Sequence, residues 1–190
     1  SVNHSNRSTA QQDNGDDKYT VHWHKNGLYL VVYTDGSTVH PQSSILARSG
    51  WAIHFARGSQ HNDSGGLAGP AQSTYRAELR AVIQAVVTSQ VPIWIKSDCL
   101  SVVNTAKALI QGDDTLQQRV RRGDIAEADL WETLIHVLQG RPDGSPVRIT
   151  WLPAHLIDTD GDQDSETQRA QKRKIEKAME KGDISQRDLR

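Results

Sequence analysis

The sequence predicts an α/β fold in which a mixed β-sheet carries helices on its faces. An apolar, β-branched run at residues 28–35 is typical of a central strand, and two shorter strand patterns follow it. From residue 74 the apolar residues recur every three to four positions, which indicates an amphipathic helix. Helix and strand patterns then alternate, and such units add further strands to the initial meander.

The elements follow from local signals along the chain. Pro92 opens the fourth strand pattern, and Gly140 ends the third helix pattern. Strands are expected at residues 28–35, 50–57, 64–69, 92–98 and 147–156. Helices are expected at residues 74–89, 97–111, 127–140 and 165–182. Residues 1–19 hold almost no apolar side chains and are expected to be disordered, which leaves residues 20–190 as the folded domain.

Composition limits the classes of function. The net charge of the 190 residues is −1, so any binding to nucleic acid must come from local basic patches. The single cysteine, Cys99, excludes an intrachain disulfide and fits a reducing compartment. No apolar stretch is as long as a membrane span, so we expect no membrane partner and a place in the cytoplasm or nucleus.

Three acidic residues stand at comparable places in these elements. Asp35 ends the first strand, Glu78 lies in the first turn of the first long helix, and Asp98 ends the fourth strand. Each alone has an ordinary explanation, as a turn residue, a helix-dipole partner or an N-cap. Strand ends in α/β sheets gather functional groups, so we expect the three carboxylates to converge. Converging carboxylates repel one another, and a divalent cation with oxygen ligands would compensate their charge.

Four motifs carry a resemblance to a known family. YTDGS, YRAEL and IKSD, in this order and spacing, resemble the three core motifs of the ribonuclease H family. WLPAHL, at residues 151–156, resembles the last-strand segment that leads into a loop histidine. The resemblance spans residues 28–156. It implies a ribonuclease H-like, five-stranded mixed sheet with the first three strands antiparallel, the first and fourth adjacent, and helices on both faces.

The resemblance also implies an activity and roles for individual residues. The implied reaction is hydrolysis of the RNA strand of RNA–DNA hybrids with two Mg²⁺ ions, for which Mn²⁺ can substitute. Asp35 would bridge both ions, Glu78 and Asp98 would each hold one side, and His155 would assist proton transfer and product release. The candidate substrate contacts are polar or flexible positions near the site and one basic cluster for the DNA strand: Gly36, Ser37, Gln72, Ser73, Thr74, Arg119, Arg121 and Arg122.

The sequence departs from the family's pattern after the histidine. The family carries a fourth acid on the following helix, and no matching stretch is present. Either the acid lies beyond Arg190, which we favour, or it is replaced by one of Asp158, Asp160, Asp162 and Asp164. On the favoured interpretation the domain lacks its C-terminal helix, and its activity is impaired. Tyr75 also stands where related domains often carry Asn or Gln.

These observations leave more than one function open. The first hypothesis is a metal-dependent endoribonuclease that acts on hybrids as a monomeric domain, tethered in its parent chain to a retroelement reverse transcriptase. A non-catalytic nucleic-acid-binding or connection module on the same fold would explain the missing fourth acid. Another nuclease of the superfamily is also compatible with the fold. Integrases, however, place their glutamate late in the chain, whereas Glu78 lies on the first long helix.

Overall fold

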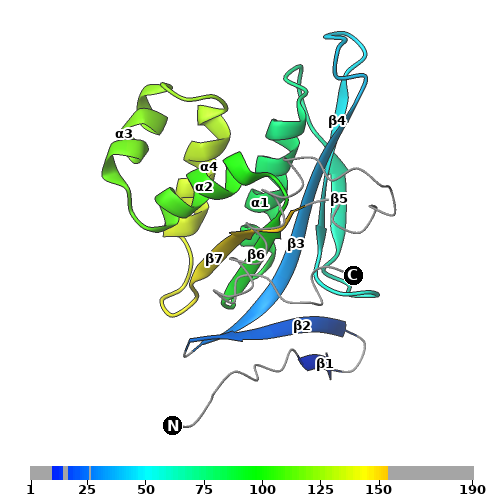
Figure 1. Cartoon of the computed structure of the whole chain (residues 1–190), viewed down its shortest axis with the longest axis vertical. Helices are drawn as coiled ribbons and strands as arrows, with labels where there is room; N and C mark the ends of the chain where they lie inside the picture. The colour runs from blue at the N-terminus through cyan, green and yellow to red at the C-terminus, as the bar shows by residue number, and fades with distance from the viewer. Residues whose placement is uncertain (1–9, 15–16, 26, 154–190) are drawn as a thin grey trace, which may run out of the picture.

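The structure is a computed structural model that describes residues 10–14, 17–25 and 27–153. These residues form a seven-stranded sheet and four helices (Figure 1). The strands are β1 (Ala10–Asn14), β2 (Asp17–His24), β3 (Gly27–Val39), β4 (Arg48–His54), β5 (Asp63–Gly66), β6 (Ile93–Ser97) and β7 (Val147–Trp151). The helices are α1 (Thr74–Thr88), α2 (Leu100–Ile110), α3 (Asp114–Arg122) and α4 (Ala128–Gln139). Of these, α3 packs against α2 and α4. The five expected strands and the first three expected helices are confirmed near their expected bounds.

Strand β3 is the centre of the sheet. Its residues 33–39 pair antiparallel with β4, which pairs antiparallel with β5. Its residues 30–34 pair parallel with β6, which pairs parallel with β7. The expected mixed sheet, with three antiparallel strands and the first and fourth expected strands adjacent, is therefore confirmed. This arrangement sets the end of β6 beside the middle of β3, where Thr34 lies opposite Ser97. Asp35 was expected to end its strand, and that is wrong, because pairing with β4 continues β3 as far as Val39.

Two additional strands precede the expected five. β1 pairs antiparallel with β2, and β2 pairs antiparallel with the start of β3, from Val21 opposite Leu30 to His24 opposite Gly27. In Figure 1 this ribbon crosses the lower end of the sheet. The expectation of disorder in residues 1–19 is therefore wrong for residues 10–14 and 17–19, while residues 1–9 lie outside the described residues. Strands β1 and β2 pair through their main chains, and such pairing needs no apolar side chains. The scarcity of apolar residues in this segment was therefore a misleading sign of disorder.

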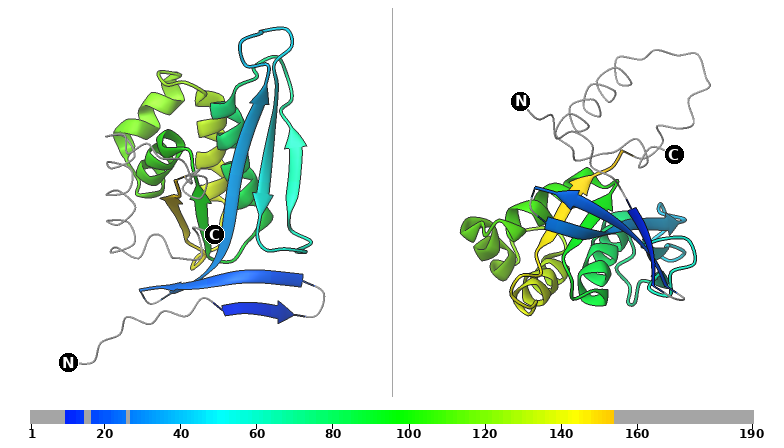
Figure 2. Two further views of the ribbon diagram at one scale, coloured as in Figure 1. Left: turned by 45° about the vertical axis from the view of Figure 1, so that its right-hand side comes forward. Right: turned by 90° about the horizontal axis from the view of Figure 1, so that it is seen from below.

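The four helices cover one face of the sheet (Figure 2). Val32, Ile53 and Ile95 of the sheet share a buried core with Leu79 and Val82 of α1, and residues of α2 and α4 belong to the same core. Helices were expected on both faces, and the expected last helix, at residues 165–182, falls outside the described residues. In the part of the chain that the structure describes, no helix has the length and apolar character needed to cross a membrane.

Helix α3 is the one described helix that the sequence patterns did not predict. Only Val120 of this helix is buried, so no apolar stripe marks it. Local signals at its two ends nevertheless define it. The Asp113 side chain accepts a hydrogen bond from the Leu116 N–H (2.9 Å), and Gly123 ends the helix in a left-handed conformation (φ 74°).

Both ends of α1 are fixed, and this matters because α1 carries Glu78. At its start, Ser73 Oγ accepts a hydrogen bond from the Arg76 N–H (3.1 Å). At its end, the Arg141 guanidinium, between α4 and β7, donates to the carbonyls of Val86 (2.8 Å), Ser89 (2.5 Å) and Val91 (2.6 Å). A guanidinium thus satisfies carbonyls at the C-terminal end of the helix and just beyond it.

Candidate active site

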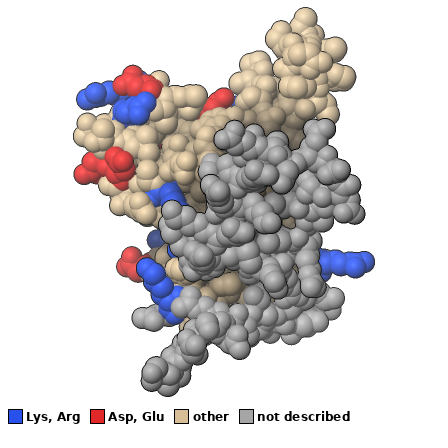
Figure 3. Space-filling model, in the orientation of Figure 1, with Lys and Arg blue, Asp and Glu red and all other residues tan. Residues whose placement is uncertain are grey.

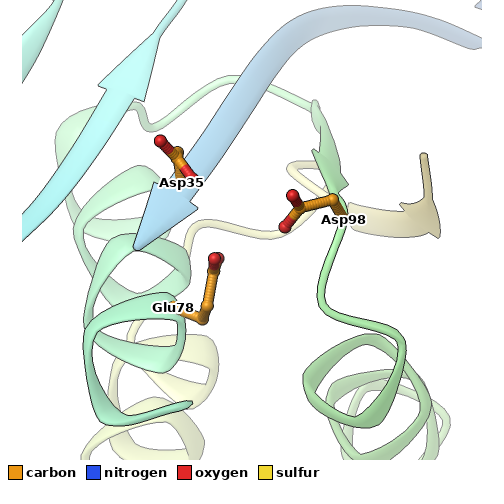
Figure 4. A group of neighbouring side chains, drawn as sticks. All are labelled: Asp35, Glu78 and Asp98. Carbon is orange, nitrogen blue, oxygen red and sulfur yellow. The ribbon is translucent and has the colours of Figure 1, made fainter. Parts of the chain in front are cut away.

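The carboxylates of Asp35, Glu78 and Asp98 meet at one place (Figure 4). Asp35 belongs to β3, Glu78 to α1, and Asp98 follows directly after β6. One oxygen from each side chain lies within 4.8 Å of the other two. Because Thr34 of β3 lies opposite Ser97 of β6, the next residue on each strand is one of these acids. The structure therefore brings together the three acids that the sequence selected.

Glu78 reaches this place because α1 packs against the main chain of β3. A Cβ added to Gly36 would lie 2.4 Å from the Glu78 nitrogen and 2.7 Å from the Ala77 carbonyl carbon. Any side chain at Gly36 would therefore push the helix away from the strand. Gly36 is also a predicted substrate contact, and that role stays a prediction. The structure gives the glycine a packing reason, since the space that a side chain would take is filled by α1.

The environment of Glu78 holds its carboxyl group in the protonated form when no cation is near. The residue is 3% exposed, whereas Asp35 and Asp98 are exposed. Burial is the main cause that raises the pKa of Glu78, from an ordinary 4.5 to about 8. The negative charges of Asp98 and Asp35 raise this pKa further, and a hydrogen bond from the Gly36 backbone opposes the shift.

The three carboxylates fit a divalent cation. Glu78 Oε2 is buried and has no hydrogen-bond partner among the described residues. A buried oxygen without a partner is unfavourable, and a cation would satisfy it. Carboxylate oxygens are the ligands that Mg²⁺ and Mn²⁺ prefer, and the exposed Asp35 and Asp98 leave one side of the site open to substrate.

Ser37, a predicted substrate contact, lies beside the carboxylates. Its side chain is exposed, and it borders a shallow depression of about 370 Å³ together with Asp35. The other residues that line the depression come from β4 and β5 and are mostly small: Gly50, Trp51, Ala52, Ser64, Gly65 and Gly66. This depression gives an extended chain room to pass next to Asp35.

The predicted contacts that precede Glu78 make hydrogen bonds within the protein. The Gln72 amide accepts from the Ser49 N–H (2.7 Å) and donates to the carbonyls of Leu67 (3.1 Å) and Gly69 (2.7 Å). Ser73 caps α1, as described above. Thr74 Oγ1 donates to Thr38 Oγ1 (3.1 Å). To contact a sugar, the Gln72 side chain would have to exchange some of its hydrogen bonds within the protein for hydrogen bonds to the substrate. These groups hold the start of α1 against the antiparallel strands, a role that the sequence did not indicate.

The remaining predicted residues lie apart from the cluster or outside the description. Arg119, Arg121 and Arg122 form the exposed last turn of α3, which packs against α2 and α4. Figure 3 shows acidic groups beside basic ones where Figure 1 draws α3. A role for these arginines in binding the DNA strand stays a prediction. His155 and the four candidate replacement acids at residues 158–164 lie outside the described residues.

Two contacts near the site were not predicted from the sequence. Arg76, two residues before Glu78, donates to Asp129 (2.6 and 3.0 Å) and to Glu127, and so joins the start of α1 to the start of α4. Trp151 donates its indole N–H to the backbone carbonyl of Asp98 (3.0 Å). The WLPAHL motif was singled out for its histidine alone. Nothing in the local pattern shows which carbonyl the indole would reach.

One acid lies within the central strand of a mixed sheet, one directly follows the neighbouring strand, and one lies on the facing helix. This arrangement defines an α/β protein with a candidate divalent-metal centre. The family model described as RNase H matches residues 28–175, most of the chain, and the chain belongs to the ribonuclease H family. This confirms the resemblance that its motifs carry. Ribonucleases of this family are nucleases that process nucleic acid.

The chain was also compared with individual proteins. Among solved structures it is similar to the foamy viral protease-reverse transcriptase in complex with dsDNA, with 22% sequence identity and a TM-score of 0.46. The match covers 67% of this chain and 83% of that chain. No curated protein matched the chain.

Proposed function

We propose that this protein is an endonuclease that hydrolyses the RNA strand of RNA–DNA hybrids with two divalent metal ions, Mg²⁺ or Mn²⁺. The observation that carries the proposal is the convergence of Asp35, Glu78 and Asp98 within 4.8 Å in a chain of the ribonuclease H family. The buried oxygen of Glu78 without a hydrogen-bond partner among the described residues supports a cation at this place.

The predicted site residues have different parts in this proposal. The bound cations would supply a nucleophilic water at neutral pH and would stabilise the leaving oxygen. Asp35, Glu78 and Asp98 would be the residues that hold the cations, since their carboxylate oxygens converge. Burial of Glu78 keeps water from the inner side, and the exposed carboxylates face the phosphodiester. Ser37, beside Asp35, contacts a sugar of the RNA strand, and His155 assists proton transfer.

A non-catalytic nucleic-acid-binding module is the second candidate. It is favoured by one observation, the lack of a stretch in the sequence that matches the family's fourth acidic motif. In that case the chain would bind hybrids and leave them intact. A monomeric domain attached to a reverse transcriptase in the parent protein, and a place in the cytoplasm or nucleus, stay predictions under either candidate.

Cleavage of a labelled RNA–DNA hybrid in the presence of Mg²⁺ or Mn²⁺ tests the proposal. We expect cleavage of the RNA strand, and we expect Asp35→Asn to lower its rate by about 100-fold or more. The matched control is Asp143→Asn, at an exposed turn residue, which should cleave like the parent. Equal cleavage by Asp35→Asn and the parent would place the active site elsewhere. Binding of the hybrid without cleavage under either cation would support the second candidate.

A further inference from the structure

The peptide unit that follows Asp98 is held at both of its polar groups. Its carbonyl, that of Asp98, accepts a hydrogen bond from the Trp151 indole Nε1 (3.0 Å). Its N–H, that of Cys99, donates to the Ser97 side-chain oxygen Oγ (3.2 Å). Ser97 and Trp151 are the last residues of β6 and β7 and lie opposite each other in the parallel pair. Both anchors therefore come from the same end of the sheet.

These anchors act in the turn between β6 and α2, beside the hydrogen bonds that the carbonyls of Ser97 and Cys99 accept from the N–H groups of Leu152 (2.8 Å) and Val103 (3.0 Å). β6 ends at Ser97 and α2 begins at Leu100, so Asp98 lies in the short turn between them. Cys99, the N-cap of α2, makes no side-chain capping hydrogen bond that would fix this turn. A peptide unit is planar, so holding its carbonyl and its N–H restricts the backbone angles on either side. The direction of the exposed Asp98 side chain follows from those angles.

The direction of the Asp98 side chain matters because Asp35 repels it. The two exposed aspartates share the site within 4.8 Å, and like charges at this distance favour moving apart. A turn without anchors would let Asp98 rotate toward solvent and would leave the cation with fewer ligands. The hydrogen bonds from Trp151 and to Ser97 hold the peptide unit after Asp98 and therefore oppose that rotation.

We propose that Trp151 is a positioning residue of the candidate metal centre, and that its indole N–H, together with the Ser97 hydroxyl, holds Asp98 toward Asp35 and Glu78. This inference rests on the proposed function, since it assumes that the three carboxylates bind a divalent cation. Trp151 itself contacts the Asp98 backbone, not the carboxylate.

The chain offers a matched control for the loss of an indole hydrogen bond. Trp94 Nε1 donates to Thr150 Oγ1 (2.8 Å), and this bond also joins β6 to β7. It does not involve Asp98 or its flanking peptide. Trp151→Phe and Trp94→Phe each remove one indole N–H and keep an aromatic ring. Only the first removes a support of the metal centre.

Direct binding of Mn²⁺ to the whole 190-residue chain, measured by calorimetry and by the EPR signal of free Mn²⁺, tests the inference. We expect Trp151→Phe and Ser97→Ala to bind Mn²⁺ about tenfold more weakly than the parent, with unchanged circular dichroism. Trp94→Phe should keep the parent affinity whatever its melting temperature. The variant that combines Trp151→Phe and Ser97→Ala should lose less Mn²⁺-binding free energy than the sum of the two single losses, because both anchors hold one peptide unit. In cleavage assays of Trp151→Phe and Ser97→Ala, the Mg²⁺ concentration needed for half-maximal rate should rise, while KM for the hybrid stays constant.

The outcomes separate the inference from the proposed function. Parent affinity in Trp151→Phe overturns the inference alone, provided that the parent binds Mn²⁺ and Asp35→Asn does not. If Trp151→Phe fails to fold, Ser97→Ala decides, and parent affinity in that variant overturns the inference. Failure of the parent to bind Mn²⁺ overturns the metal centre, and the inference with it. If Trp94→Phe loses as much Mn²⁺ affinity as Trp151→Phe, the cause is a general effect of strand packing. That result would also overturn the inference about Trp151.

Discussion

Gly36 and Glu78 are in direct main-chain contact, with the Glu78 nitrogen 2.4 Å from where a Cβ on Gly36 would lie. Helix α1 can approach β3 this closely only because residue 36 has no side chain. The contact makes one glycine responsible both for strand–helix packing and for the position of a carboxylate in the candidate metal centre.

Gly36→Ala is expected to destabilise the protein and to weaken the metal centre together. The added methyl group meets main-chain atoms that cannot rotate away, so unfolding should become easier by about 2 kcal/mol. Mn²⁺ affinity should fall as Glu78 is displaced. The control is Gly50→Ala, where the nearest atom to a new Cβ is the Gly65 carbonyl oxygen at an ordinary 3.5 Å. Chemical denaturation and Mn²⁺ titration of both variants check this, and equal stability of the two would contradict it.

The stability of the metal-free protein is expected to depend on pH through Glu78. Burial and the two neighbouring carboxylates raise its pKa from 4.5 to about 8, so the folded state binds this proton more tightly than the unfolded state. The contribution is fully present below about pH 4.5 and is lost as the pH rises through about 8. Unfolding free energies measured in EDTA should therefore fall between these pH values. The full shift corresponds to about 5 kcal/mol, and solvent around the exposed Asp35 and Asp98 should reduce the change to something on the order of 2 kcal/mol.

Glu78→Gln should remove most of this pH dependence, because glutamine does not titrate. Mg²⁺ should act in the opposite direction, stabilising the parent more above about pH 8 than below pH 5, since it binds the deprotonated carboxylates. A Gln variant with the same pH slope as the parent would show that other groups cause it.

Replacing Arg141 is expected to destabilise the protein without removing the carboxylate cluster. Its guanidinium donates to three carbonyls at and beyond the end of α1, and its Nε donates to the Ser145 carbonyl (2.9 Å). Arg141→Met leaves these carbonyls without their charged donor and should cost about 2 to 3 kcal/mol. Arg141→Lys should recover part of the loss, because one ammonium cannot reach all of them.

Thermal and denaturant unfolding of the Arg141 variants measure this cost. Arg57→Met is the matched control, since Arg57 is exposed in the loop after β4. Equal unfolding free energies for Arg141→Met and Arg57→Met would mean that these hydrogen bonds contribute nothing.

The basic turn of α3 is expected to bind phosphates. If Arg119, Arg121 and Arg122 contact the DNA strand, changing all three to Gln should raise KM for the hybrid and leave kcat nearly unchanged. The slope of log affinity against log salt should decrease by about 0.9 for each duplex phosphate that the variant no longer neutralises. Binding titrations over a range of KCl concentrations check this, with Arg57→Gln as control. An unchanged salt slope would remove α3 from the binding surface.

Periodicity predicted most of the fold because burial of apolar faces dominates it. The helix at 74–88 and the strand at 93–97 bury most of their residues, and their apolar patterns show it. Helix α3 and strands β1 and β2 depend on caps and main-chain pairing, which leave little trace in an apolar pattern. The same limit explains why the contact of Gly36 with α1 and the hydrogen bonds of Gln72 within the protein were not predicted.

By itself the sequence selected the three acids that the structure brings together. Glu78 and Asp98 could be selected because local residue patterns show where a helix starts and where a strand ends. Asp35 could be selected because it follows an apolar run and precedes a glycine, although β3 continues past it to Val39. Only the tertiary structure decided how these acids are supported: the closeness of α1 to Gly36, the guanidinium of Arg141 at the end of α1, and the indole of Trp151 behind Asp98. These interactions join residues between 42 and 55 positions apart, or depend on a missing side chain, and their geometry is fixed only when the sheet and its helices pack together.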